Sequence, residues 1–255
     1  MSGPSFQNGE IKDSSATGVQ KEMGRDLICV VPARLGSQRV PRKMVRPFAG
    51  SSLLEICLRK LLMCPSLKDR LYLSASLEEP EIVAVGDRLG VPVFHRSQAS
   101  LAEPSDCRTV HDYAASLDSE FFLHVNACNP LLRAETVERA VRVWAATEAP
   151  SLMAVVRRDT FFFDDVGRML NGFRGTEANR ATLETKLVDP IWEAAHSLYI
   201  WRREEVVKYN RFFSMAPGDP YLFEIPPREF YDIDNEDQFH VAELVYMDRY
   251  GHIKT

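Results

Sequence analysis

Short apolar runs alternate with longer amphipathic stretches along most of the chain, and this pattern predicts its elements. The short runs predict strands buried on both faces of a sheet; they cover residues 27–31, 70–76, 91–96, 120–127 and 151–158. Apolar residues at helical spacing predict helices between them, over residues 51–64, 79–90, 105–117 and 134–148. Regular alternation of strand and helix predicts an α/β fold, a mostly parallel sheet with helices on both faces in three layers.

The alternation breaks at residue 159. Residues 159–195 have no clean period, which predicts either a functional insert or an interaction arm. The aromatic run Phe161–Phe163 opens it, so we expect these rings to contact another subunit or to form a small satellite core. Beyond it the pattern predicts a strand, a helix, an extended segment and a last helix, over residues 197–201, 203–210, 221–227 and 236–250.

The first 25 residues differ in composition from the rest. They are rich in Gly, Ser and polar residues and lack an apolar signal core, which predicts a disordered tail and no secretory signal. No stretch approaches the roughly 18 apolar residues of a membrane span, so no membrane partner is expected. We therefore expect one folded domain over residues 26–255.

Charge is balanced over the whole chain. With 31 basic and 36 acidic residues the net charge is −5, which argues against nucleic acid as a partner. The five cysteines are scattered and several lie in apolar runs. This spacing favours reduced core thiols in a cytoplasmic protein over a disulfide framework or a zinc site.

One loop concentrates positive charge. No acidic residue lies between Leu27 and Leu54, and the loop after the first strand carries five cations: Arg34, Arg39, Arg42, Lys43 and Arg46. Ligands of open parallel sheets gather at the carboxyl ends of the strands, where this loop begins. Arginine, lysine and a glycine-containing backbone suit phosphate oxygens. The alternative is a loop that is solvated or paired with distant acids. The GxxxxGK[ST] and GxGxxG patterns are absent.

Two aspartates precede the last helix, in the segment YDIDNED. In an extended chain Asp232 and Asp234 point to one side while Ile233 faces the core. Two carboxylates completed by substrate oxygens and water are a common way to hold Mg²⁺. The alternative is that the aspartates cap the helix, although Asn235 or Asp237 could do so equally well.

Single histidines and cysteines are weaker evidence for a functional site. His95, His111, His124 and His196 show no ligand spacing and are expected to be core or surface residues. Cys128 has no partner signature for nucleophilic catalysis, so we expect a small buried residue there.

Two segments together resemble the signatures of an enzyme family, the sugar cytidylyltransferases. The family patterns PARxGSxxxPxKNxxxxxGxPL and DIDxxxDxxxAE are similar to PARLGSQRVPRKMVRPFAG and YDIDNEDQFHVAEL. The resemblance is to the acylneuraminate cytidylyltransferases and their pseudaminic and legionaminic acid relatives, and more distantly to the CMP-Kdo synthetases. It includes FHRS, VNACNPLL and MAVVRRDTF, and covers residues 27–160 and 221–250.

The resemblance implies a Rossmann-like (GT-A-like) nucleotidyltransferase fold, with residues 159–195 as an arm that packs on the second subunit of a homodimer. It implies transfer of CMP from CTP to an acidic, sialic-acid-like 2-keto-3-deoxy sugar, with release of pyrophosphate. Asp232 and Asp234 would hold Mg²⁺, and Arg34 and Lys43 would be catalytic. The residues expected at the nucleotide are Ala33, Arg34, Leu35, Gly36, Ser37, Arg39, Lys43 and Arg96. For Arg96 a surface arginine at a strand end is the alternative.

The chain departs from the family on the sugar side. Ser76 stands where the family has an aspartate. Asn126 and Ala127 replace the residues that usually begin the family's PTSPLL motif, and the RRQ-type motif for the sugar is missing. Two alternatives therefore stay open. One is the same fold acting on another acceptor, such as a phosphonate or a sugar phosphate, or on another nucleotide. The other is a non-catalytic nucleotide-binding homologue.

Overall fold

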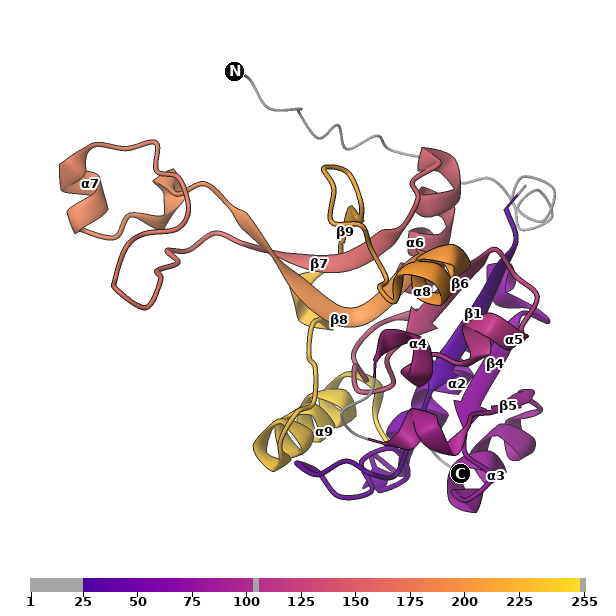
Figure 1. Ribbon diagram of the computed structural model, residues 1–255. Helices are drawn as coiled ribbons and strands as arrows, with labels where there is room; N and C mark the ends of the chain where they lie inside the picture. Colours follow the sequence, from indigo (N-terminus) through magenta and orange to yellow (C-terminus); the bar gives the residue numbers. More distant parts are fainter. Residues whose placement is uncertain (1–24, 103–105, 253–255) are drawn as a thin grey trace.

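A seven-stranded sheet forms the centre of the computed structural model, which describes residues 25–102 and 106–252 (Figure 1). The strands are β1 (Leu27–Pro32), β4 (Leu71–Ala75), β5 (Val93–His95), β6 (Phe121–Val125), β7 (Leu152–Arg158), β8 (Ile191–Arg202) and β9 (Tyr221–Glu224). Their order is β5-β4-β1-β6-β8-β7-β9, and in this sheet β8 alone is antiparallel to its neighbours. The predicted mostly parallel sheet is confirmed. The tail expected over residues 1–25 lies outside the described residues, except for Arg25.

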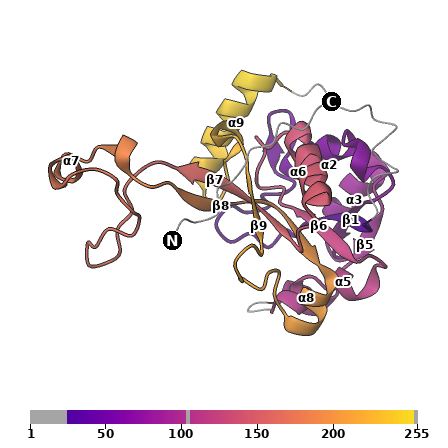
Figure 2. The same cartoon turned by 90° about the horizontal axis from the view of Figure 1, so that it is seen from above.

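Helices cover both faces of the sheet (Figures 1 and 2). The helices are α2 (Leu53–Leu62), α3 (Pro80–Leu89), α4 (Cys107–Val110), α5 (Tyr113–Ser116), α6 (Ala134–Thr147), α7 (Glu177–Ala181), α8 (Arg203–Tyr209) and α9 (Glu236–Tyr250). Short 3₁₀ turns are η1 (Pro65–Leu67), η2 (Gln98–Leu101), η3 (Thr185–Leu187) and η4 (Pro227–Glu229), and β2 (Pro47–Phe48) pairs with β3 (Ser51–Ser52).

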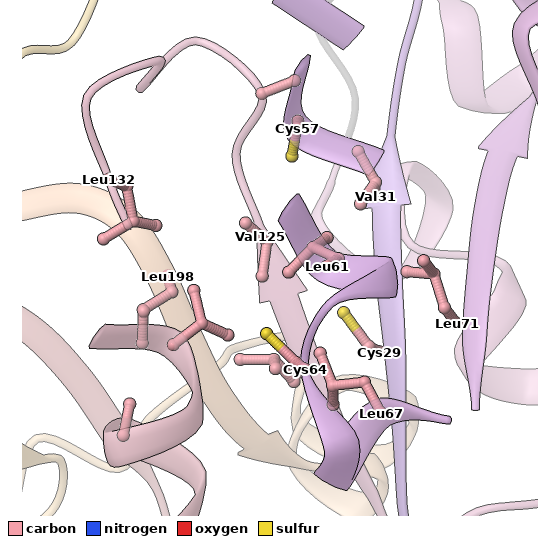
Figure 3. Packing of buried hydrophobic residues seen from close by; sticks show 14 of the residues in the cluster. Cys29, Val31, Cys57, Leu61, Cys64, Leu67, Leu71, Val125, Leu132 and Leu198 are labelled. Atoms are coloured by element: carbon pink, nitrogen blue, oxygen red, sulfur yellow. The ribbon is translucent and has the colours of Figure 1, made fainter. Parts of the chain in front are cut away.

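Alternate residues of β1 point to opposite faces and so enter two cores. Cys29 and Val31 pack with α2, α3 and α6 on one face, where three of the cysteines lie among leucines (Figure 3). Val30 packs on the other face against Tyr113 and Trp201, which belong to α5 and β8. Burial on both faces explains why β1 is an uninterrupted apolar run.

Local capping fixes the helix ends that the sequence predicts. The Ser52 hydroxyl accepts a hydrogen bond from the Glu55 N–H at 3.3 Å and begins α2. Pro80 occupies the first turn of α3, and Gly90 ends that helix with a left-handed φ of 67°. These ends set the position of the loop that precedes α2 and of the acidic first turn of α3.

The single helix predicted over residues 105–117 is wrong. The structure has two short helices there, α4 and α5, because His111 leaves helical geometry at φ −110° and ψ 46°. The His111 ring is buried against the ring of Phe212, with centroids 4.9 Å apart, and its Nδ1 lies 3.2 Å from the Tyr113 hydroxyl. The contacts of the buried His111 ring therefore outweigh the helical pattern of residues 105–117, and the segment forms two helices.

Helix α9 returns to the beginning of the domain. Its residues Phe239, Ala242 and Tyr246 form a second apolar cluster with Phe48 and Ile233. The rings of Phe48 and Phe239 form a T-shaped, edge-to-face contact, with centroids 5.3 Å apart. This packing places the segment before α9 beside the loop that follows β1.

Between β7 and β8 the chain leaves the sheet and forms an arm (Figures 1 and 2). Residues 159–190 contain α7, η3 and two isolated bridges, Phe163 to Met169 and Phe173 to Val188. Residues 191–195, which the sequence assigns to the insert, belong to β8. Several large apolar side chains of this arm are exposed: Phe163, Val166, Leu170 and Leu183.

Candidate active site

The loop after β1 is the cationic wall of the candidate site, and distant elements hold it in place. The Ala33 N–H donates to the Ser74 carbonyl at 2.9 Å, and the Leu35 N–H donates to the Glu79 carboxylate at 2.6 Å. These two backbone donors are therefore engaged within the protein. Gly36 is exposed at the outer turn of the loop, and the Ser37 hydroxyl accepts from the Val40 N–H at 3.3 Å.

Three cations of the loop pair with acids from α3, from α9 and from the segment before α9. Arg39 donates to Asp234 at 2.6 Å, and Arg46 pairs with Glu236 at 2.7 Å. Arg42 pairs with Glu81 of α3. The alternative that the loop is salt-bridged to distant acids thus holds for these three cations. All three pairs are exposed, so each contributes about 0–1 kcal/mol and can exchange its carboxylate for another anion.

Lys43 is different, because its side chain is only 8% exposed. Its ammonium donates to the Ile233 carbonyl at 2.5 Å. The Lys43 side chain is therefore part of the packed fold. Lys43 joins the cationic loop after β1 to the segment that carries both aspartates.

Arg34 and Arg96 lie near enough to one another to interact electrostatically. Arg96 is 6% exposed, and its guanidinium donates to the Ser100 hydroxyl at 2.7 Å and to the Ser100 carbonyl at 2.8 Å. Burial, and the charge of Arg34 to a smaller degree, lower the pKa of Arg96. Arg96 is therefore a buried residue that orders the segment after β5, and the surface alternative does not hold.

The two aspartates lie opposite this wall. Ile233 between them is fully buried, as the alternation predicts, and its N–H donates to the Cys128 carbonyl at 3.1 Å. Burial raises the pKa of Asp232, and the charge of Asp234 adds to this, whereas Lys43 opposes it. Asn235 caps α9: its side chain accepts from the Gln238 N–H at 2.9 Å. The capping alternative for the aspartates is therefore wrong.

The oxygen donors here fit a hard divalent cation. Asp232 lies 3.4 Å from the Asn129 amide nitrogen, and the Asn129 Oδ1 is buried without a hydrogen-bond partner among the described residues. No cluster of three or more acidic, histidine or cysteine ligands occurs in the described parts of the chain. A Mg²⁺ ion would thus take two carboxylates from the protein and its remaining ligands from phosphate oxygens and water.

His196 lies at the same edge and was not found by sequence reasoning. On β7, Met153 pairs with Tyr199 and Val155 pairs with Ala194, so β8 bulges over the residues between. Within this bulge His196 adopts a left-handed φ of 50°, which is costly for a residue other than glycine. A bulge depends on the register of two strands, and the sequence HSLY has no signal for it.

Polar contacts hold His196 in this strained conformation. Its carbonyl accepts from the amides of Asn126 and Asn129, at 3.1 and 3.3 Å. Its Nδ1 lies 2.6 Å from the Tyr199 hydroxyl. The side chain is exposed and near enough to Asp232 to lower the pKa of that carboxyl. Bulges and strained residues of this kind are typical of functional sites.

Cys128 lies beside this site but does not provide a nucleophile. Its side chain is 7% exposed, and burial raises the pKa of the thiol, so the thiol stays protonated. This agrees with the expected small buried residue.

A family model for cytidylyltransferases matches residues 28–245. The chain belongs to the cytidylyltransferase family. The matched range includes the cationic loop after β1, the bulge of β8 and both aspartates. The resemblance seen in the two sequence signatures is thus confirmed at the level of the family.

Curated relatives match part of the chain. It is 30% identical to a 3-deoxy-manno-octulosonate cytidylyltransferase of Chlorobium luteolum over 128 residues, 49% of this chain and 48% of that protein. It is 26% identical to the protein of that name from Acidobacterium capsulatum, over 42% of this chain and 41% of that protein. The matches thus span less than half the length of these relatives.

Solved structures share the fold over nearly their whole length. A CMP:2-keto-3-deoxy-manno-octonic acid synthetase complexed with CTP superposes with a TM-score of 0.62 at 13% identity, covering 88% of this chain and 99% of that one. The 4-diphosphocytidyl-2C-methyl-D-erythritol synthase of Anaerococcus prevotii gives 0.61 at 14% identity, covering 90% and 99%. The nucleotidyltransferase fold is therefore confirmed. No helix in the described residues has the length and apolarity to cross a membrane.

Proposed function

We propose that this protein transfers CMP from CTP to an acidic sugar and releases pyrophosphate. The observation that carries the proposal is the convergence of the cationic loop after β1 with the aspartate pair, through Lys43 to Ile233 at 2.5 Å and Arg39 to Asp234 at 2.6 Å. A triphosphate needs concentrated positive charge, and the transfer step needs carboxylates nearby for a metal ion. Both are present at one edge of the sheet.

The residues divide into a nucleotide side and an acceptor side. Arg34, Arg39 and Lys43 would neutralise the triphosphate, with Lys43 fixed in position by its bond to Ile233. The acceptor hydroxyl would bond to the α-phosphorus while the bond from that phosphorus to the β-bridging oxygen breaks, and pyrophosphate would carry the electron pair away. The hydroxyl proton passes to water or to a nearby base. Positioning and charge compensation suffice for this chemistry, and no covalent enzyme intermediate is needed.

We further propose that Asp232 and Asp234 hold Mg²⁺. When bound, the ion would supply charge neutralisation at the phosphate and at the attacking oxygen. His196 and Tyr199 would contact the acceptor, because they are polar, hydrogen-bonded to one another and lie beside Asp232.

The acceptor is proposed as a sialic-acid-like or Kdo-like sugar on the strength of the relatives named above. Asn126, which departs from the family motif, contacts the carbonyl of His196 on this side of the site. A phosphonate or a sugar phosphate is the rival acceptor. The free cysteines support a reducing compartment, the cytoplasm.

A screen of nucleotides against acceptors tests the proposal. Each of CTP, UTP, ATP and GTP is incubated with 2-keto-3-deoxy sugar acids, a phosphonate and a sugar phosphate, and pyrophosphate is measured with Mg²⁺ present. We expect release with CTP and a keto-sugar acid. Release with another acceptor would identify that acceptor as the substrate in place of the sugar acid. A thermal shift caused by CTP, without release of pyrophosphate in any combination, would favour a non-catalytic nucleotide-binding protein.

A further inference from the structure

A separate cleft of about 400 Å³ carries three arginines. It is lined by Arg133, Arg228, Glu229, Arg249 and Tyr250. These residues come from the residue before α6, from η4 and from the last turn of α9. None of them belongs to the candidate active site. A cleft of this size is large enough for a small metabolite.

The acid in the cleft does not neutralise its arginines. Glu229 is 2% exposed, and its Oε2 accepts the backbone N–H of Arg133 at 3.1 Å. Lys60 and Arg139 also interact electrostatically with this carboxylate from the protein side. Three arginines and one carboxylate line the cleft, so its lining keeps a net positive charge.

Two of the arginines are held together on one wall. The Arg249 guanidinium donates to the Arg228 carbonyl at 2.6 Å, yet neither guanidinium has a carboxylate partner among the described residues. Arg133 pairs with Glu135 at 3.2 Å, but both side chains are exposed, so this pair contributes little. Like charges held at one place repel each other unless an anion lies between them.

We propose that this cleft binds a compact anion that carries two or more phosphate or carboxylate groups. The fork of a guanidinium matches both groups, and a multivalent anion can bridge arginines from η4, from α9 and from the start of α6. A monovalent anion would meet one arginine at a time in a solvent-exposed setting and would bind weakly. Tyr250, whose side chain is exposed at the rim, offers a ring and a hydroxyl to the rest of the ligand.

The cleft and the candidate active site lie at two ends of the same pair of segments. At one end the Ile233 N–H donates to the Cys128 carbonyl, and at the other the Arg133 N–H donates to Glu229. Cys128 and Arg133 are five residues apart in the chain, so the distance between their Cα atoms is at most about 18 Å. An anion in the cleft would therefore contact the segments that carry Asn129 and Asp232.

Calorimetric titration of the full chain tests the proposal. The titrants are inorganic pyrophosphate and citrate, with sodium acetate at matched ionic strength as the monovalent comparison. The proteins are the wild type, Arg228→Gln/Arg249→Gln, and Arg108→Gln as a matched control, because Arg108 is also exposed and its side chain lies outside the cleft. All three proteins keep the cationic loop after β1, so any binding of pyrophosphate there is the same in each and does not affect the comparison.

We expect the double variant to bind pyrophosphate or citrate at least tenfold more weakly at one site, while the control keeps wild-type affinity and acetate binds to none. Pyrophosphate alone would identify a phosphorylated ligand, and citrate alone a polycarboxylate. Equal isotherms for all three proteins, or equal weakening in the control, would overturn the proposal. Melting temperatures within about 2 °C of the wild type show that both variants are folded.

Discussion

Arg39 and Asp234 are 195 residues apart in the chain, and their side chains meet at 2.6 Å. The pair joins the loop after β1 to the segment before α9, so it links the cationic loop of the candidate site to the aspartate pair. Both side chains are largely exposed, at 69% and 42%. Each partner can therefore exchange the other for a ligand of opposite charge at little cost.

Lys43→Met is expected to abolish turnover, because it removes the ammonium but keeps the apolar stem that is buried in the fold. The Ile233 carbonyl loses its donor, which costs about 1–3 kcal/mol of unfolding free energy. Pyrophosphate release and urea unfolding measure the two effects. Lys68→Met, on an exposed lysine outside the loop, is the control and should change neither. Normal turnover in Lys43→Met would remove this residue from the mechanism.

Asp232→Asn and Asp234→Asn should each lower turnover by at least about 100-fold, since an amide is a poor ligand for Mg²⁺. The raised pKa of Asp232 means that its ionised form is disfavoured in the folded protein. Asp232→Asn should thus leave the melting temperature unchanged or higher. Titration of Mg²⁺ in the activity assay should show partial rescue of at least one variant. Full activity in both would refute the metal site.

His196→Gly should stabilise the protein by up to about 1 kcal/mol, because glycine adopts a left-handed φ without strain. The same change removes the imidazole, so we expect KM for the acceptor to rise while KM for CTP does not. His196→Ala is the matched variant: it loses the ring but keeps the strain, so only the kinetic effect should appear. Unchanged acceptor KM in both variants would assign His196 a purely structural role.

The exposed rings of the arm predict a homodimer. Phe163 is 52% exposed and its ring stacks on that of Phe161, with centroids 6.3 Å apart. Phe163→Glu would place a charge in the proposed contact and should shift the protein from dimer to monomer in light scattering at micromolar concentration. Tyr209→Glu, on a ring that is 55% exposed outside the arm, is the control. A wild-type monomer with normal activity would disprove this prediction.

Acid should destabilise the fold through His111. Burial lowers its pKa to about 2, from about 6.5 in the unfolded chain. Between these values the unfolded state binds a proton that the folded state does not. The unfolding free energy is therefore fully retained above pH 6.5 and falls below it, by up to about 1.4 kcal/mol per pH unit for this group. His111→Gln should have a shallower slope in urea unfolding between pH 7 and pH 5; equal slopes would contradict this.

The sequence predicted the elements well where a local pattern decides them. The buried strands β1 and β6 and the capped helices α2 and α9 begin and end within two residues of the predicted bounds, because periodicity and caps are local properties. The cationic loop after β1 and the aspartate pair could also be singled out, because each lies on one short segment, and the structure brings the two segments together.

What the sequence did not predict depends on residues far away in the chain. Lys43 is buried because a segment 190 residues later covers it. His196 projects from a bulge that exists only in the register of β8 against β7. The break at His111 follows from a ring of Phe212, about 100 residues further on, and no local pattern contains that contact.

The bond from Lys43 to the Ile233 carbonyl also bears on how the protein is made. During synthesis the N-terminal part of the chain is made first, so the cationic loop after β1 is complete long before Ile233 is added. Strands β1, β4, β5 and β6 can already pair in parallel at that stage, whereas β8 must still insert beside β6. A nascent chain would therefore carry a cationic loop without its anchor. Ordering of the candidate site is thus coupled to near-completion of translation, and a prematurely terminated chain that ends before Ile233 would lack that order.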